Sequence, residues 1–250
     1  MGGIALGQIL AVVSGKGGTG KTSLCAGIAC CLAEAEQKVL CIDADVGLRN
    51  LDISLGLTQE PALPFTAVMR GEYPLSRAAV HPAFPNLHFL TAPVTEAPEN
   101  LDLDDFHKLL QEIRQTYDWC LIDAPAGIGP GFHLAVRHAD QAIVVTGGDP
   151  AALRDGARTA EALERISRAE AKIVVNRIRK KFFQRTRSTV DDCMDLIGLP
   201  LLGIVPEDET VSVSAARGLA LCQTTKKGAA LACRHIANRL RGIKQPLLHL

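Results

Sequence analysis

A glycine-rich stretch near the start of the chain carries two lysines and a threonine at spacings that suit phosphate chemistry. It consists of Gly15, Lys16, Gly17, Gly18, Thr19, Gly20, Lys21 and Thr22. This is the P-loop pattern G-x-x-x-x-G-K-[ST], in which glycines let backbone N–H groups surround phosphate oxygens. A following helix would aim its N-terminal dipole at the same charge. We therefore expect these residues and Ser23 to bind a nucleotide, with Lys21 at the terminal phosphates and Thr22 helping to hold Mg²⁺.

The same glycines also fit the dinucleotide fingerprint G-x-G-x-x-G, and Asp43 could then be the acid that binds a ribose. That pattern does not call for Lys-Thr directly after its last glycine. A second strand that ends in an acid also suits Mg²⁺ better than NAD. The P-loop interpretation is therefore favoured, over both the dinucleotide site and a purely structural glycine turn.

Three acidic residues follow the carboxyl ends of apolar segments. Asp43 and Asp45 come after one such segment, and Asp123 ends another. Phosphoryl transfer depends on positioning and on charge neutralisation, which requires a metal ligand and a group that orients the attacking water. Asp123 has the place of a Walker B acid, so we expect Thr22 and Asp123 around Mg²⁺, with one of Asp43 and Asp45 supporting the metal and the other holding the attacking water. The alternative for each acid is the capping of a turn.

The base of the nucleotide is suggested by the segment after a late strand. Small GTPases read guanine there with an Asn-Lys-x-Asp run, whereas this chain has Asn176-Arg177-Ile178-Arg179. No acid is available in that run to pair with the guanine edge. Adenine is therefore the favoured base.

Apolar strands alternate with helical segments along the whole chain, which predicts a mostly parallel sheet of about seven strands with helices on both faces. Ligands then bind at the carboxyl ends of the strands. We find no internal repeat and no domain boundary, so residues 1–250 are expected to form one α/β domain of the P-loop NTPase type. The expected strands are 9–13, 38–43, 87–91, 119–123, 141–146, 171–176 and 201–205, and the main helices 23–36, 104–117, 151–167, 190–197 and 226–241.

The composition excludes several classes of protein. The formal net charge is zero and gives no general case for nucleic-acid binding. The eight cysteines include no C-x-x-C pair, and most lie in apolar segments, where cysteine behaves as a small hydrophobe. No apolar run is long enough to span a bilayer, and the start of the chain lacks the basic region of a signal peptide. We expect a cytoplasmic protein in a reducing compartment.

The second lysine of the loop, Lys16, directly follows the first glycine and makes the loop unusual. The run KGGTGKT resembles the deviant Walker A loop of the MinD/ParA family of ATPases. Residues 43–52 (DADVGLRNLD) are similar to the switch I run of that family, most closely in its MinD branch. Residues 123–127 (DAPAG) resemble its switch II, and residues 206–208 (PED) resemble its segment after the last strand. The resemblance covers almost the whole chain.

The resemblance implies an ATP- and Mg²⁺-dependent homodimer. In such a dimer Lys16 reaches the phosphates of the partner subunit, Lys21 binds those of its own, and Asp45 positions the attacking water. Asn50 senses the nucleotide, and Arg154 and Asp155 lie near a surface for partner proteins. Four further residues are expected around the adenine: Asn176, Arg177, Pro206 and Asp208.

Two features depart from the family pattern. Family members often carry a glutamate that approaches the ATP across the dimer, where this chain has the shorter Asp149. We expect the usual C-terminal amphipathic helix that binds anionic membrane to be absent, because the sequence ends at Leu250. A basic cluster at 177–187, interrupted by two phenylalanines, could contact a membrane, DNA or an acidic partner, but a solvated loop is the simpler interpretation.

Our leading hypothesis from the resemblance is a switch ATPase that dimerises with ATP, recruits an inhibitor of the MinC kind or another partner, and so places the division septum. It would be cytoplasmic, with a possible peripheral place at the inner face of the membrane. The alternatives are a flagellar-number regulator of the FlhG type and a ParA-type DNA partition protein. A metabolic ligase that activates a carboxylate with ATP is a further alternative from another class.

Overall fold

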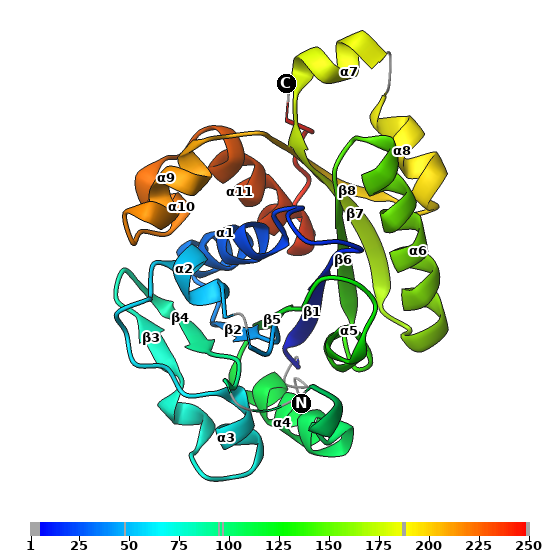
Figure 1. The fold of residues 1–250 in the computed structure, drawn as a ribbon. Coiled ribbons are helices and arrows are strands. Elements are labelled where there is room, and N and C mark those ends of the chain that lie inside the picture. Colours follow the sequence, from blue (N-terminus) through cyan, green and yellow to red (C-terminus); the bar gives the residue numbers. More distant parts are fainter. Residues whose placement is uncertain (1–5, 48, 95, 97, 187–188, 249–250) are drawn as a thin grey trace, which may run out of the picture.

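One eight-stranded sheet runs through the molecule in the order β3-β4-β2-β5-β1-β6-β7-β8 (Figure 1). The structure, a computed structural model, describes residues 6–47, 49–94, 96, 98–186 and 189–248. All strand pairs are parallel except β3 with β4. The strands are β1 (Gln8–Val13), β2 (Val39–Asp43), β3 (Ala79–His81), β4 (Phe84–Leu90), β5 (Trp119–Asp123), β6 (Gln141–Thr146), β7 (Glu170–Ile178) and β8 (Leu201–Pro206).

Helices cover both faces of the sheet (Figure 1). One face packs against α1 (Lys21–Glu34), α2 (Leu51–Leu55), α10 (Leu221–Thr224) and α11 (Gly228–Leu240). The other face packs against α3 (Phe65–Met69), α4 (Leu103–Thr116), α5 (Pro130–Val136), α6 (Pro150–Ile166) and α8 (Val190–Ile197). The remaining helices are α7 (Lys180–Thr186) and α9 (Thr210–Ala216).

The alternation of side chains along β1 explains why the sheet has two cores. Leu10 and Val12 point into the core under α1, whereas Ile9, Ala11 and Val13 point into the core under α4 and α5. Since successive side chains of a strand face opposite ways, a continuously apolar strand must be covered on both sides. β1 is at the centre of the sheet, between β5 and β6, and the loop that follows it is held rigidly at both ends.

The predicted alternation of strands and helices is confirmed, with differences of detail. β3 adds one short antiparallel strand at the edge, which is not among the strands expected from the sequence. α7 replaces the loop expected in the basic cluster, and the short helices α9 and α10 were not expected. Arg187 of that cluster and Leu48 of the switch I run lie outside the described residues.

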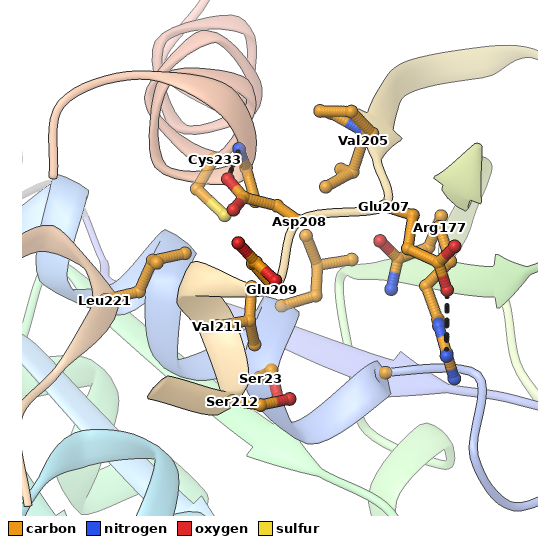
Figure 2. Close-up of a pocket in the computed structure, with 15 residues that line it drawn as sticks. Ser23, Arg177, Val205, Glu207, Asp208, Glu209, Val211, Ser212, Leu221 and Cys233 are labelled. Carbon is orange, nitrogen blue, oxygen red and sulfur yellow. Dashed lines mark hydrogen bonds and ion pairs between the residues drawn. The ribbon is translucent and has the colours of Figure 1, made fainter. Parts of the chain in front are cut away.

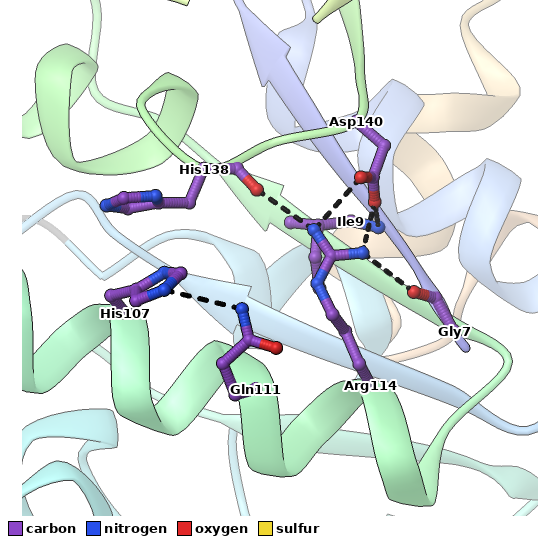
Figure 3. Close-up of polar contacts among 7 residues, drawn as sticks. All are labelled: Gly7, Ile9, His107, Gln111, Arg114, His138 and Asp140. Carbon is purple, nitrogen blue, oxygen red and sulfur yellow. Dashed lines mark hydrogen bonds and ion pairs between the residues drawn. The ribbon is translucent and has the colours of Figure 1, made fainter.

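A polar network joins elements at the amino ends of the strands (Figure 3). The Arg114 guanidinium on α4 donates to both carboxylate oxygens of Asp140, at 2.5 and 3.0 Å, and to the carbonyl oxygens of Gly7 and His138. Asp140 also accepts the backbone N–H of Ile9 at 2.7 Å. The network fixes where β1 and β6 begin.

The lengths and hydropathies of the helices bear on membrane insertion. Across the described ranges, none of them combines the length and the apolar character that crossing a bilayer requires.

Candidate functional site

The P-loop connects β1 to α1 at the carboxyl end of the central strand. Gly18 and Gly20 have φ angles of 79° and 81°, in the left-handed region that favours glycine. Position 20 also has no room for a side chain, because a Cβ there would lie 2.4 Å from the amide nitrogen of Asn176. Gly20 is therefore required by both backbone conformation and packing.

Side chains outside the loop hold its carbonyl oxygens. The Asn176 amide on β7 donates to the carbonyl of Thr19 at 2.7 Å, and Arg177 donates to that of Gly18 at 3.0 Å. Ser14 donates its hydroxyl to the carbonyl of Lys16 at 3.0 Å. β7 thus supports the loop from the side, with Arg177 at an unusual φ of 56°.

Lys21 and Asp123 form a buried ion pair at the start of α1. The Lys21 ammonium lies 2.7 Å from the Asp123 carboxylate, and the two residues are 6% and 1% exposed. Burial raises the pKa of Asp123, while the charge of Lys21 and hydrogen bonds from Lys21 and Thr22 oppose the rise. The structure therefore brings together residues of two separate motifs, Lys21 and Thr22 of the P-loop and Asp123 at the end of β5.

Asp43 holds the backbone that follows β2. Its two carboxylate oxygens accept the N–H groups of Asp45 at 2.9 Å and Leu51 at 3.1 Å. Burial, together with the nearby charge of Asp123, raises the pKa of Asp43 to about 6. Asp43 is thus close to Asp123, as expected of a metal site, but its oxygens are already bonded to the switch I backbone.

Asp45 and Asn50 lie in the segment that Asp43 supports. Asp45 is half-buried, and burial raises its pKa while the charge of Lys21 lowers it. Asn50 is exposed and directly precedes α2, without a side-chain bond to the first turn of that helix. Both side chains are accessible to a ligand at the P-loop.

A cavity of about 560 Å³ opens beside the P-loop, between β7, β8 and the helices α1, α9 and α11 (Figure 2). Four predicted base-contact residues and two from the start of α1 line it: Asn176, Arg177, Pro206, Asp208, Gly20 and Ser23. Leu24, Val205, Val211 and Leu221 supply apolar walls. Apolar walls with a few polar groups suit a flat heterocyclic base.

Asp208 has a structural task in the wall of this cavity. One carboxylate oxygen accepts the N–H of Thr210 at 2.9 Å, and the other accepts that of Ala229 at 3.0 Å. Although burial opposes the change, these bonds lower the pKa of Asp208. A single carboxylate thus joins the first turns of α9 and α11 behind the cavity.

A second cavity of about 360 Å³ lies on the other side of Arg177 and is lined by Lys16 and Asp149. Lys16 lies 3.9 Å from Asp149, and the two side chains are 40% and 52% exposed. Asp149 also accepts the N–H of Ala152 and so caps α6. The shorter residue at position 149 therefore contacts the second lysine of its own chain.

Sequence reasoning missed the pairing of Glu207 with Arg177 and Arg179. Glu207 accepts from Arg177 at 3.1 Å and also pairs with Arg179, and this lowers the pKa of Glu207. Glu207 lies between Pro206 and Asp208, two residues expected around the base, and this position in the sequence could have identified it as a residue of the site. Arg154 and Asp155 lie on α6, where the Asp155 carbonyl accepts the hydroxyl of Thr159 and packs against Gly15, since a Cβ at position 15 would lie 2.5 Å from it.

The residues fit a nucleotide with Mg²⁺ on two observations. The Thr19 hydroxyl oxygen is buried at the loop and has no hydrogen-bond partner, which is costly unless a ligand supplies one. Among the described residues there is no group of three or more acidic, histidine or cysteine side chains able to hold a metal alone. Thr22 and Asp123 suit a Mg²⁺ that takes its other ligands from phosphate oxygens and water.

Known proteins similar to this chain agree with this geometry. The family described as the CobQ/CobB/MinD/ParA nucleotide binding domain matches residues 10–221. The septum site-determining protein MinD of Synechocystis is 36% identical over 96% of this chain and 92% of its own length. The structure resembles the MinC:MinD cell division protein complex of Aquifex aeolicus, with a TM-score of 0.88, 34% identity and coverage of 97% and 98% of the two chains.

A second similar structure contains nucleotide. It is the MinD protein of Pyrococcus horikoshii complexed with Mg-ADP, with a TM-score of 0.80, 27% identity and coverage of 94% of this chain and 96% of that one. The chain described here belongs to the CobQ/CobB/MinD/ParA family of nucleotide-binding proteins and resembles its MinD members.

Proposed function

We propose that this protein is a MinD-type ATPase that binds Mg²⁺ and ATP at the P-loop and uses hydrolysis to control where the division septum forms. The observation that carries the proposal is the buried pair of Lys21 and Asp123, 2.7 Å apart beneath a loop whose Thr19 hydroxyl lacks a partner. The identity to MinD proteins over nearly the full chain supports the cellular part.

Three residues have roles at the phosphates in this proposal. Lys21 leaves Asp123 and binds the terminal phosphates, which neutralises charge that develops during transfer. The Thr22 hydroxyl and Asp123 hold Mg²⁺, which supplies charge neutralisation on the phosphate oxygens. When Lys21 moves to the phosphates, Asp123 is left as a buried carboxylate without its cation. Because a buried charge must be paired, Asp123 then requires another cation, and the ion pair thus supports an exchange of Lys21 for Mg²⁺.

Asp45 is the proposed group that positions the attacking water. Its side chain is half-buried, close enough to Lys21 for that charge to lower its pKa, and it does not cap a helix in the structure. Asp43 has a supporting role at the metal, because it fixes the backbone of Asp45 and Leu51. Asn50, next to that backbone, is suited to respond to the nucleotide.

Adenine is proposed to occupy the 560 Å³ cavity. Asn176, Arg177 and Pro206 supply its polar and flat contacts. Asp208 stabilises the wall, and its two carboxylate oxygens are directed at the N–H groups of Thr210 and Ala229, so the carboxylate is oriented towards the backbone and not towards a guanine edge. This argument supports ATP over GTP.

The proposed active form is a homodimer in which Lys16 contacts the phosphates of the partner subunit. Lys16 is partly exposed and its 3.9 Å contact with Asp149 is long, so little free energy opposes its release. MinC is the proposed partner, because a similar structure is a MinC:MinD complex. A cytoplasmic protein that associates peripherally with the membrane fits this role.

The test compares nucleotide binding with hydrolysis. Wild-type protein should bind ATP more tightly than GTP in calorimetry and release phosphate only with Mg²⁺. Asp45→Asn should retain ATP binding and lose at least about 100-fold in hydrolysis, while Asp195→Asn, an exposed acid on α8, should match the wild type. Equal hydrolysis by the two variants would remove Asp45 from the mechanism.

The cellular part has separate readouts. Cells that lack the protein should place their septa away from the normal site, and the wild-type gene should restore them while the Asp45→Asn gene should not. Lys16→Ala should bind ATP and fail to dimerise in light scattering. Normal septa in cells without the protein would reject the septum role but leave the ATPase assignment standing.

A further inference from the structure

Two cysteines from distant parts of the chain meet behind the nucleotide cavity. The sulfur of Cys31, on the P-loop helix α1, lies 3.4 Å from the sulfur of Cys222, on α10. The residues are 191 positions apart in the sequence. Cys25 on α1 and Cys41 on β2 form a second side-chain contact between cysteines, but only the Cys31–Cys222 contact joins α1 to α10.

We propose that Cys31 and Cys222 are a thiol pair that a peroxide oxidises to a disulfide, which joins the P-loop helix to α10. The sulfurs need to approach by only about 1.4 Å to reach the usual disulfide length of about 2.05 Å. Rotation of two side chains can supply most of that movement.

Neighbouring contacts hold the two helices in the required position. Glu34, at the end of α1, pairs with Lys226 at 2.5 Å and with Arg234 on α11 at 2.7 Å. The Cys222 sulfur also faces the carbonyl oxygen of Gly27 at 3.7 Å. These contacts come from both sides of α10, so the pair is held by tertiary structure.

The two thiols differ in reactivity. A hydrogen bond from Cys31 lowers the pKa of Cys222, helped by the charges of Lys226 and Arg234 and opposed by burial and by the charge of Glu34. The same bond and burial raise the pKa of Cys31. Cys222 is therefore the thiol that loses its proton first and attacks the oxidant.

A route for a small oxidant exists on the cavity side. Both cysteines are buried, at 3% and 1% exposure, but Leu221 and Cys233 next to the pair line the 560 Å³ cavity. α10 is only four residues long, and short helices open locally at low cost. A peroxide can reach Cys222 through this wall, whereas a bulky reagent cannot.

The chemistry balances with hydrogen peroxide as the oxidant. The Cys222 thiolate attacks one peroxide oxygen, the O–O bond breaks, and the departing hydroxide takes up the thiol proton as water. Cys31 sulfur then attacks the sulfur of the resulting sulfenic acid, the S–O bond breaks, and the oxygen leaves as a second water with the Cys31 proton. The two thiols lose two electrons, and the peroxide gains them.

The test uses the full reduced chain without nucleotide, treated with hydrogen peroxide, denatured and alkylated. Of the eight cysteines, six should then react with the alkylating reagent. Tryptic digestion should yield residues 22–38 linked to residues 218–226, and dithiothreitol should separate them. Eight reactive thiols, or a linkage between other peptides, would overturn the proposal.

Residues 22–38 also contain Cys25 and Cys30, so matched variants identify the partner. Cys30→Ala, one residue from Cys31 on the same helix, should keep the linkage, and Cys31→Ala should lose it. Fragmentation of the wild-type linked peptide assigns the bond even if a variant fails to fold. Linkage through Cys30 would overturn the pairing.

The melting temperature tests whether the bond forms in the native arrangement. A cross-link across a loop of this length should raise the Tm of the wild type by roughly 5–10 °C on oxidation. Cys31→Ala should show no such rise. An unchanged or lower Tm in a fully linked wild type would mean that the bond distorts α10, contrary to the proposal.

Discussion

The two edges of the sheet carry polar groups of similar kinds in opposite conditions. At the amino edge, Arg114 and Asp140 satisfy each other and bond to three backbone groups. At the carboxyl edge, the acids Asp43 and Asp123 are buried side by side with raised pKa values, and the Thr19 hydroxyl has no partner. The polar groups at the amino edge are paired within the protein, whereas those at the carboxyl edge become fully paired only when a ligand binds.

The difference shows how a parallel sheet separates stability from function. Polar groups at the amino edge gain by bonding to each other, so their removal weakens folding. Burial of the polar groups at the carboxyl edge costs free energy, and a bound phosphate and metal can reduce that cost. Variants at the two edges should therefore affect different measurements.

The largest expected effect is the loss of Lys21. Lys21→Ala should lower the rate of ATP hydrolysis by roughly 100-fold or more, because a preorganised cation at the phosphates is removed. Phosphate release measures the effect. Lys38→Ala, a lysine near the amino edge that lies 5.0 Å from the Tyr117 ring, should retain the wild-type rate. Comparable losses of ATP hydrolysis in Lys21→Ala and Lys38→Ala would contradict the proposed difference between the two edges.

The next effect is on folding. Arg114→Met should lower the free energy of unfolding by about 2 kcal/mol, since Asp140 loses its cation but keeps some solvent exposure. Urea denaturation measures the loss, and ATP affinity should be unchanged. Arg165→Met breaks an exposed pair with Glu161 at 4.0 Å and should cost less than about 0.5 kcal/mol. Weaker ATP binding by Arg114→Met would mean that the amino edge also serves the site.

A smaller effect should follow from loosening the P-loop. Asn176→Ala removes the 2.7 Å bond to the Thr19 carbonyl and should weaken ATP binding by about tenfold, or ~1.4 kcal/mol. Calorimetric titration with ATP measures the change. Asn86→Ala removes a 3.4 Å contact with Glu36 far from the loop and is the matched control. An unaltered dissociation constant for Asn176→Ala would show that the loop needs no support from β7.

The smallest effect concerns pH at the amino edge, where the rings of His107 and His138 lie 4.1 Å apart (Figure 3). Burial and the charges of His107 and Arg137 lower the pKa of His138 in the folded chain. The unfolded chain then binds protons more tightly, so this part of the stability is present above pH ~6.5 and is lost as pH falls below it.

The size of that loss should be a few tenths of a kcal/mol, because solvent screens the half-buried ring. His107→Gln removes the neighbouring charge and should reduce the fall in the free energy of unfolding between pH 7.5 and 5.5. Equal pH profiles for the variant and the wild type would show that the stacked rings do not interact electrostatically.

Three features could be predicted from the sequence because each depends on local patterns: the sheet, its helices, and the proximity of the P-loop to Asp43 and Asp123. Continuously apolar runs identify buried strands, and the carboxyl ends of parallel strands must lie at one edge. The edge strand β3 was missed because three residues, with Val80 52% exposed, carry almost no apolar signal.

Contacts between distant side chains could not be predicted in the same way. Both Asp43 oxygens accept backbone N–H groups, and this depends on the path of residues 45–51. The pairing of Glu207 with Arg179 depends on how β7 and β8 end. The Cys31–Cys222 contact joins helices almost 200 positions apart. No spacing rule in the sequence relates such residues.

The three side chains that hold the P-loop carbonyls also determine where its amides point. In a trans peptide the C=O of one residue and the N–H of the next are directed oppositely across one rigid plane. Because Ser14, Arg177 and Asn176 draw the carbonyls of Lys16, Gly18 and Thr19 outward, the N–H groups of Gly17, Thr19 and Gly20 must face the other way. The chain thus presents an anion receptor before any anion arrives, and little reorganisation should accompany the first contact with phosphate.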